Sequence, residues 1–192
     1  MSFQSKSFIL KSLICALSLW TATCQALTIP PERDPAYNSS INPKYNSAIN
    51  PEYNSSINPK YNSSINPTYN SSINPTYNSS INPKYNSSIN PLYNSSLNPK
   101  YNVSLDPTKS RWSGLYVFTV EGDVFGVAVK AEHGVLILFA SEAKWKGYFV
   151  SNGSAGFNWF DTKGEWLGYL VKNSENGFCL FTKDGEWLGF AN

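Results

Sequence analysis

This sequence of 192 residues has few of the side chains that build metal and nucleophilic sites. It has three cysteines and one histidine. Cys15 and Cys24 fall in a predicted signal peptide, so Cys179 is expected to be the one thiol of the mature chain. That excludes an intramolecular disulfide and a cysteine metal cage. His133 has no companion ligands for a metal site, and we expect it to be partly exposed near a hairpin turn.

An excess of charge of either sign is also lacking. From Leu27 onward the chain has 13 basic and 13 acidic residues, which argues against a nucleic-acid partner. No Ser-His-Asp arrangement, phosphate loop or metal motif stands out, so we expect a protein that is not an enzyme and needs no cofactor. Glu165 and Glu186 occupy equivalent repeat positions and are expected to be solvated turn residues. A glycosidase needs two carboxylates in different roles.

The amino-terminal segment from Met1 to Ala26 has the layout of a signal peptide. Lys6 and Lys11 precede an apolar run, Ser12–Trp20, and small residues lead to a predicted cut after Ala26. The run is too short to span a bilayer as a permanent helix. An uncleaved anchor is the rival interpretation, and a lipoprotein is disfavoured because no aliphatic residue stands three places before Cys24. We expect a secreted, periplasmic or cell-surface protein with no stable transmembrane span after cleavage.

Proline is absent after Pro107 and regular before it. Residues 27–36 are expected to form an extended linker. Residues 37–108 then repeat an octapeptide, most often Tyr-Asn-Ser-Ser-Ile-Asn-Pro-Lys, nine times. Asn-Pro favours a type I turn, with Asn at the first corner and Pro at the second. A proline every eight residues disfavours a continuous helix.

The large apolar residues of the octads recur every four positions, alternately tyrosine and isoleucine or leucine. An extended strand would place them all on one face. Two architectures fit the array: a flexible spacer with local turns, or a stacked solenoid with one octad per rung. Each octad has too few apolar groups to offset an ordering cost of about 1–2 kcal/mol per residue. The spacer is therefore favoured, and we expect a largely extended or disordered region.

Two motifs overlap in the octads. Asn38-Ser39-Ser40 and most of its copies match the N-glycosylation sequon, which would make the array a glycosylated stalk in a eukaryotic source. Asn42-Pro43-Lys44-Tyr45 resembles the Asn-Pro-x-Tyr peptide docked by phosphotyrosine-binding domains, although Ser40 stands where those ligands usually have an apolar residue. The motif ends at Tyr45, Tyr53, Tyr61, Tyr69, Tyr77, Tyr85, Tyr93 and Tyr101.

Residues 109–192 contain a second repeat, with a period of 21. Its register is set by four glycines and by a phenylalanine eight places before each: Gly126, Gly147, Gly168 and Gly189, with Phe118, Phe139, Phe160 and Phe181. Short β-prone runs alternate with turn sequences, as in strands 168–172 and 178–182 around the turn 173–177. We expect a mostly β fold of four tandem hairpin repeats, either one open layer or a closed structure with pseudo-four-fold symmetry.

The Phe-x-x-x-Gly-x-Trp-x-Gly unit, clearest at 160–168 and 181–189, resembles the bacterial four-fold β-flower domain. That resemblance implies a compact closed β domain. The unit is also similar to the choline-type cell-wall-binding repeat, whose aromatic residues form ligand cages, and more distantly to the MORN repeat. Phe178-Cys179-Leu180 departs from the choline pattern, the period departs from the MORN pattern, and Ala143 and Val124 depart from the flower-like unit.

The aromatic side chains of this region are expected to supply mainly core and cross-strand pairs. A functional alternative exposes some of them as platforms for sugar or a cationic head group: Trp145, Trp159, Trp166 and Trp187.

The leading hypothesis is an exported, non-enzymatic repeat protein that binds a glycan, envelope component or protein through an aromatic face, with the octads as a spacer or contact surface. The alternative is a host-directed protein that presents several Asn-Pro-x-Tyr motifs to phosphotyrosine-binding-type domains. A third option is a structural surface protein without a ligand.

Overall fold

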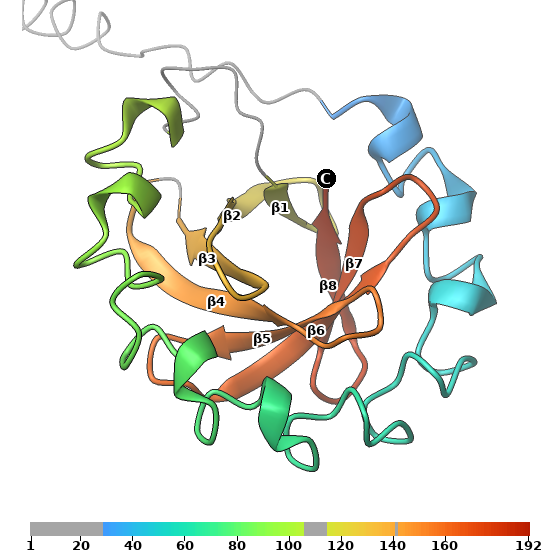
Figure 1. Cartoon of the computed structure of the whole chain (residues 1–192). Helices are drawn as coiled ribbons and strands as arrows, with labels where there is room; N and C mark the ends of the chain where they lie inside the picture. The colour runs from blue at the N-terminus through green and yellow to red at the C-terminus, as the bar shows by residue number, and fades with distance from the viewer. Residues whose placement is uncertain (1–28, 106–114, 141) are drawn as a thin grey trace, which may run out of the picture.

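The computed structural model describes residues 29–105, 115–140 and 142–192 of the chain. The predicted signal peptide, 1–26, and the predicted boundary between the two repeat regions at residue 108 lie outside these described residues. Figure 1 shows a β-barrel with a run of short turns along its outside.

Eight strands pair in chain order, each antiparallel to the next, and β1 also pairs with β8 to close the barrel. The prediction of a mostly β domain built from hairpins is confirmed, and of the two arrangements left open the closed one is observed. The strands are β1 Leu115–Thr119, β2 Val124–Lys130, β3 Val135–Phe139, β4 Trp145–Ser151, β5 Phe157–Asp161, β6 Trp166–Lys172, β7 Phe178–Thr182 and β8 Trp187–Ala191.

Closure depends on glycines that let neighbouring backbones approach each other. A Cβ atom on Gly189 would collide with the carbonyl oxygen of Phe118 across the seam between β8 and β1. The collision recurs once in each copy of the barrel repeat, between Gly126 and Phe139, Gly147 and Phe160, and Gly168 and Phe181. The strand register shifts beside each of these phenylalanines. The glycines that set the sequence register are thus the close-approach points of the sheet.

Both faces of the barrel wall are apolar. In β4, Phe149 packs inward with Val117, Leu138 and other interior residues. Its neighbours Tyr148 and Val150 belong to a second buried cluster, on the outer face, that includes Ile81 and Ile89 of the octads. The strands therefore read as continuous apolar runs because octads cover their outer side.

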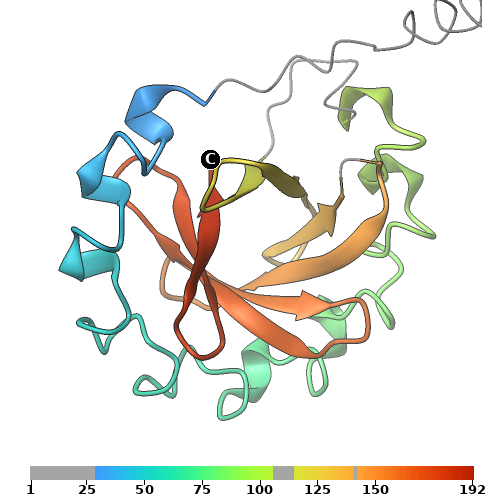
Figure 2. The ribbon, with the colours of Figure 1, turned by 180° about the vertical axis from the view of Figure 1, so that it is seen from behind.

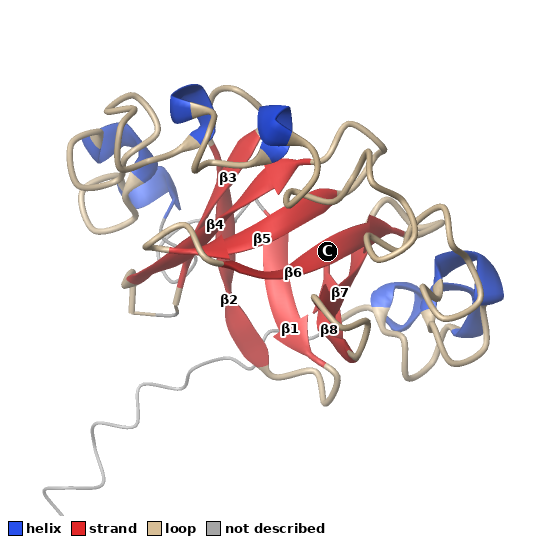
Figure 3. Ribbon diagram, turned by 90° about the horizontal axis from the view of Figure 1, so that it is seen from below, coloured by secondary structure: helices blue, strands red, loops and turns tan. Residues whose placement is uncertain are grey.

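The octads form ordered turns around this outer face, shown from the opposite side in Figure 2 and from below in Figure 3. Six of the octad turns are 3₁₀ segments: η2 Ser39–Ile41, η3 Ser47–Ile49, η4 Ser71–Ile73, η5 Ser79–Ile81, η6 Ser95–Leu97 and η7 Val103–Leu105. A further 3₁₀ segment, η1 Pro31–Arg33, precedes the first octad.

This arrangement corrects the expectation of a largely extended or disordered octad region. The amide of Tyr45 donates to the carbonyl of Asn42 at 3.0 Å, and the amide of Ile49 donates to that of Asn46 at 3.3 Å. The predicted extended linker, 27–36, likewise contains the turn Pro31–Arg33. The expectation failed because the octads bury their apolar residues on the barrel, a surface that the repeat itself does not reveal.

The expectation that tyrosine and isoleucine share one face holds only for an extended strand, and the array is not one. The chain turns twice per octad, so residues four apart point in opposite directions. Tyr45 is 76 % exposed and Ile49 is 7 % exposed. We call the side that carries the tyrosines, the residues before them and the exposed serines the outer face of the array. The side that carries the Ile-Asn-Pro residues is its inner face.

Candidate functional site: the outer face of the octad array

Two asparagines per octad hold the array together. The first belongs to Asn-Pro: Asn42 accepts a hydrogen bond from the amide of Lys44 at 2.9 Å and donates to the carbonyl of Pro35, seven residues earlier, at 2.8 Å. One side chain thus starts its own turn and ties it to the proline seven residues earlier, which in the later copies belongs to the preceding octad. The same pair of bonds recurs at Asn50, Asn58, Asn66, Asn74, Asn82, Asn90 and Asn98.

The second asparagine follows each tyrosine and caps the turn that comes next. Asn46, before η3, accepts from the amide of Ala48 at 3.0 Å and donates to the carbonyl of Ser40 at 2.6 Å. Most copies of this asparagine lie in the sequons. Their amide nitrogens therefore already donate to the preceding octad, which gives them a structural role whether or not they carry sugar.

The inner face meets the barrel with a longer period than the octad. Ile41, Ile65 and Ile89 have exposed fractions of 0 %, 2 % and 0 %, the lowest among the octad isoleucines. Each of them stands three octads before the next. The array therefore seats every third isoleucine most deeply.

The barrel residues opposite them follow the period of the barrel repeat. The thiol of Cys179 donates to the carbonyl of Ile41 at 3.3 Å, and the side-chain amide of Asn158 donates to the carbonyl of Ile65 at 2.9 Å. One repeat before Asn158 lies Ile137, in the same buried cluster as Ile89. Three octads therefore match one repeat of the barrel, and the two segments run in opposite directions around it.

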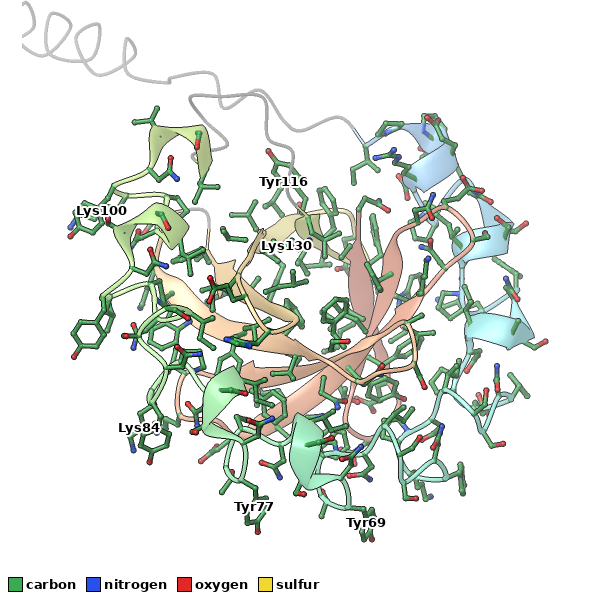
Figure 4. The ribbon with its side chains drawn as sticks, in the orientation of Figure 1. Tyr69, Tyr77, Lys84, Lys100, Tyr116 and Lys130 are labelled. Atoms are coloured by element: carbon green, nitrogen blue, oxygen red, sulfur yellow. The ribbon has the colours of Figure 1, made fainter. Side chains whose placement is uncertain are left out.

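The tyrosines point the other way. The nine from Tyr37 to Tyr101 have exposed fractions between 63 % and 78 %. Figure 4 shows Tyr69 and Tyr77, with Lys84 and Lys100, pointing away from the barrel. All eight predicted tyrosine-motif residues thus lie on one continuous surface, the outer face of the array.

The four predicted tryptophans do not form one platform. Trp145, Trp166 and Trp187 lie half-buried on the outer side of the barrel, and each donates its indole N–H to the carbonyl of the glycine two residues later, at 2.7–2.9 Å. Trp159 instead packs with the interior cluster, edge-on to Phe125. The structure therefore separates Trp159 from the other three.

The Asn-Pro-x-Tyr motif forms a hydrogen-bonded turn, as predicted, and its tyrosine is exposed. The residues before it do not form a strand: Ser39–Ile41 is a 3₁₀ turn, and Ile41 is buried. A phosphotyrosine-binding domain pairs with an extended strand at that place. Such pairing would require part of the octad to leave the barrel.

The interface between array and barrel was not predicted. One signal was present: Asn158 is polar where the neighbouring copies of the barrel repeat carry Ile137 and Cys179. Cys179 itself is buried as expected, and burial raises the pKa of its thiol to about 12. His133 lies in a turn with half of its side chain exposed, also as expected.

The described residues contain no cluster of three or more His, Cys, Asp or Glu side chains arranged for a metal ion. Within the same ranges, no helix has the length and apolar character needed to cross a membrane. The fold and the site thus define a closed eight-stranded barrel whose outside is covered over most of its circumference by its own octapeptide array. Comparisons with protein-family models, with curated proteins and with solved structures found no match.

Proposed function

We propose that this chain is an exported, non-enzymatic binding protein whose contact surface is the outer face of the octad array. The barrel is its scaffold. Export is inferred from the segment Met1 to Ala26, and the partner classes are a glycan, an envelope component or a protein. Four copies of the barrel repeat with approximate four-fold symmetry would give the scaffold its regular circumference.

The observation that carries this proposal is the opposite exposure of two large residue types in the same octads. Isoleucines are buried on the barrel, while nine tyrosines at a constant spacing of eight residues stay in solvent. Tyrosine offers a large contact area at low side-chain entropy cost and is enriched in binding surfaces. The tryptophans contribute less to such a surface, because three of them donate hydrogen bonds within the barrel and the fourth lies inside it.

The test is a variant in which Tyr61, Tyr69, Tyr77 and Tyr85 are replaced by serine. We expect the unmodified protein to co-sediment with purified cell-wall or envelope fragments, and the variant to lose this binding with an unchanged melting temperature. A control variant replaces exposed apolar residues of the barrel, Val124 and Leu188, by serine and should still bind. Equal binding by the tyrosine variant, or no binding by the unmodified protein, would contradict the proposal.

A second function is favoured by the closed Asn-Pro-x-Tyr turn with its exposed tyrosine. In this alternative, a kinase phosphorylates several tyrosines and modular domains bind them together. Incubation with a tyrosine kinase, followed by capture on an immobilised phosphotyrosine-binding domain, would detect it. Failure of capture after confirmed phosphorylation would exclude this function.

A further inference from the structure

The lysines of the octad array are confined to one position. Each stands immediately before a tyrosine and is exposed. The ammonium groups of Lys60, Lys84 and Lys100 lie over the following tyrosine ring, 5.3–5.5 Å from its centroid. The fourth, Lys44, lies 5.8 Å from the ring of Trp187 instead. A cation and an aromatic face are thus offered together at several places along the array.

Charge is divided between the two parts of the molecule. The octads from Tyr37 to Leu105 contain four lysines and one acidic residue, Glu52, so their formal charge is +3. Residues 115–192 contain six lysines and nine acidic residues, a formal charge of −3. The near-neutral total therefore conceals a positive strip that coincides with the tyrosines. A strip of this kind attracts anions to the outer face and not to the barrel ends.

From this coincidence we infer that the outer face binds a linear polysaccharide that bears acidic groups at intervals. The inference rests on the proposed function and names its partner. The C–H face of a sugar ring packs against an aromatic ring, and an acidic substituent pairs with the adjacent ammonium group. A constant spacing of nine rings suits a ligand that is itself periodic. Exposed serines such as Ser63 lie between the rings in the sequence and would supply hydroxyl partners.

The spacing of the cations favours a polysaccharide over a nucleic acid. Lysine fills only four of the eight positions before a tyrosine in the array, and the other four are Glu52, Thr68, Thr76 and Leu92. A single-stranded nucleic acid has a phosphate on every nucleotide and is bound through a continuous basic groove. A polymer that is neutral over part of its length places fewer anions opposite uncharged or acidic positions.

The experiment measures affinity for immobilised hyaluronan, which has a carboxylate on alternate sugars, with hydroxyethyl cellulose as the neutral polymer and poly(dT) as the nucleic acid. The protein is compared with a variant carrying K60Q, K84Q and K100Q. We expect the variant to bind hyaluronan about tenfold more weakly, because exposed ion pairs contribute modestly each. A control with K130Q, K163Q and K172Q makes the same charge change on the barrel and should bind like the unmodified protein.

Two results support the inference: added salt weakens hyaluronan binding, and the protein binds poly(dT) more weakly than hyaluronan. Equal binding to hyaluronan and hydroxyethyl cellulose would overturn it while leaving the proposed function intact, provided that the tyrosine variant loses both. Tighter binding to poly(dT) would overturn it in favour of nucleic acid. Envelope binding that survives the tyrosine replacements would overturn the proposed function and the inference together.

Discussion

The side-chain amide of Asn158 in β5 donates a 2.9 Å hydrogen bond to the main-chain carbonyl of Ile65, far earlier in the chain. Asn158 is fully buried, and its Oδ1 atom has no hydrogen-bond partner within the described residues. Because the octads are nearly identical, the hydrogen bonds inside the array do not distinguish one octad from the next. The hydrogen bond from Asn158 of the barrel does distinguish one octad, the one that contains Ile65, from its neighbours.

Replacement of Asn158 by alanine should lower the free energy of unfolding by about 2 kcal/mol. The buried carbonyl of Ile65 loses its donor and the side chain leaves a void. Urea denaturation monitored by tryptophan fluorescence measures the change. The control is the same replacement by alanine at the exposed Ser63, in the same octad as Ile65. It should change the free energy of unfolding little. An Asn158→Ala protein as stable as the parent would show that this bond does not seat the array.

The number of octads should matter to stability. Three octads match one repeat of the barrel, so nine octads match three repeats. The segment just before the array also contacts the barrel, where the side-chain amide of Asn192 donates to the carbonyl of Arg33 at 2.7 Å. With eight octads the chain cannot satisfy the contacts of Arg33, Ile65 and Ile89 at once.

We therefore expect deletion of residues 69–76 to cost about 1.5–3 kcal/mol, the value of one buried isoleucine, and insertion of a tenth octad to destabilise as well. Thermal melting of the three proteins measures this. The two changes alter length in opposite directions, so each serves as the control for the other. A monotonic rise of the melting temperature from eight to ten octads would refute the matching of the two periods.

Two tyrosines of the barrel should be better replaced by phenylalanine. The hydroxyl groups of Tyr148 and Tyr169 are buried without a hydrogen-bond partner in the described part of the chain, and Phe190 occupies the equivalent position in the next copy of the repeat. Removing an unsatisfied hydroxyl while keeping the ring should leave stability unchanged or raise it by up to about 1 kcal/mol per site. Tyr61→Phe on the outer face is the control. A clear loss of stability in either barrel variant would reveal a partner for the hydroxyl.

Alkaline pH should unfold the protein through the same residues. Burial raises the pKa of Tyr148 and Tyr169 above 10.0, with the charge of Asp161 adding to the effect on Tyr148, and burial raises the pKa of Cys179 from 9.0 to about 12. A raised pKa means that the unfolded chain loses the proton first. Stability is therefore complete below pH 9 and falls as the pH rises from 9 towards 12, by up to about 1.4 kcal/mol per pH unit for each group.

A triple variant, Y148F, Y169F and C179V, should lose most of this slope, as measured by urea denaturation between pH 8 and pH 11. Below pH 9 the free energies of unfolding of the parent and the variant should depend on pH in nearly the same way. An equally steep decline in the variant would assign alkaline unfolding to other groups. The folded parent should also react slowly with thiol reagents, because the thiolate is the reactive form.

Ala143 occupies a backbone position that suits glycine. Its φ is +57°, and the residues at the equivalent places of the other three repeats are Gly122, Gly164 and Gly185, all with positive φ. Replacement of Ala143 by glycine should stabilise the protein by about 1 kcal/mol, because the left-handed conformation strains a residue with a Cβ. Gly164→Ala is the reverse experiment and should destabilise by a similar amount. A melting temperature that falls in Ala143→Gly would contradict this explanation.

Much of the barrel was predictable, because local signals coincide there. Alternation of β-prone runs with turns located the strands, including β6 and β7. The regularly spaced glycines located the copies of the repeat, and the structure adds that they are points of close approach. The docking of the octads was not predictable in the same way. Most octads have a single isoleucine or leucine, and their charges show no pattern that indicates a partner. The surface they cover is formed by residues such as Tyr148 and Val150, which would also suit a two-layer core. The match of three octads to one barrel repeat relates the array to the barrel. It becomes visible only when the folds of both regions are known.

The outward side of the barrel wall has a consequence for the order of folding. The octads are synthesised before the strands that they cover, so their isoleucines have nothing to pack against until the barrel closes. During that interval the segment must stay soluble and must not pair with other chains. Proline in each repeat blocks strand pairing, and the abundant serine and asparagine keep the waiting segment hydrated. The linker-like composition thus suits a segment that is synthesised before the barrel and packs against it only after the barrel has closed.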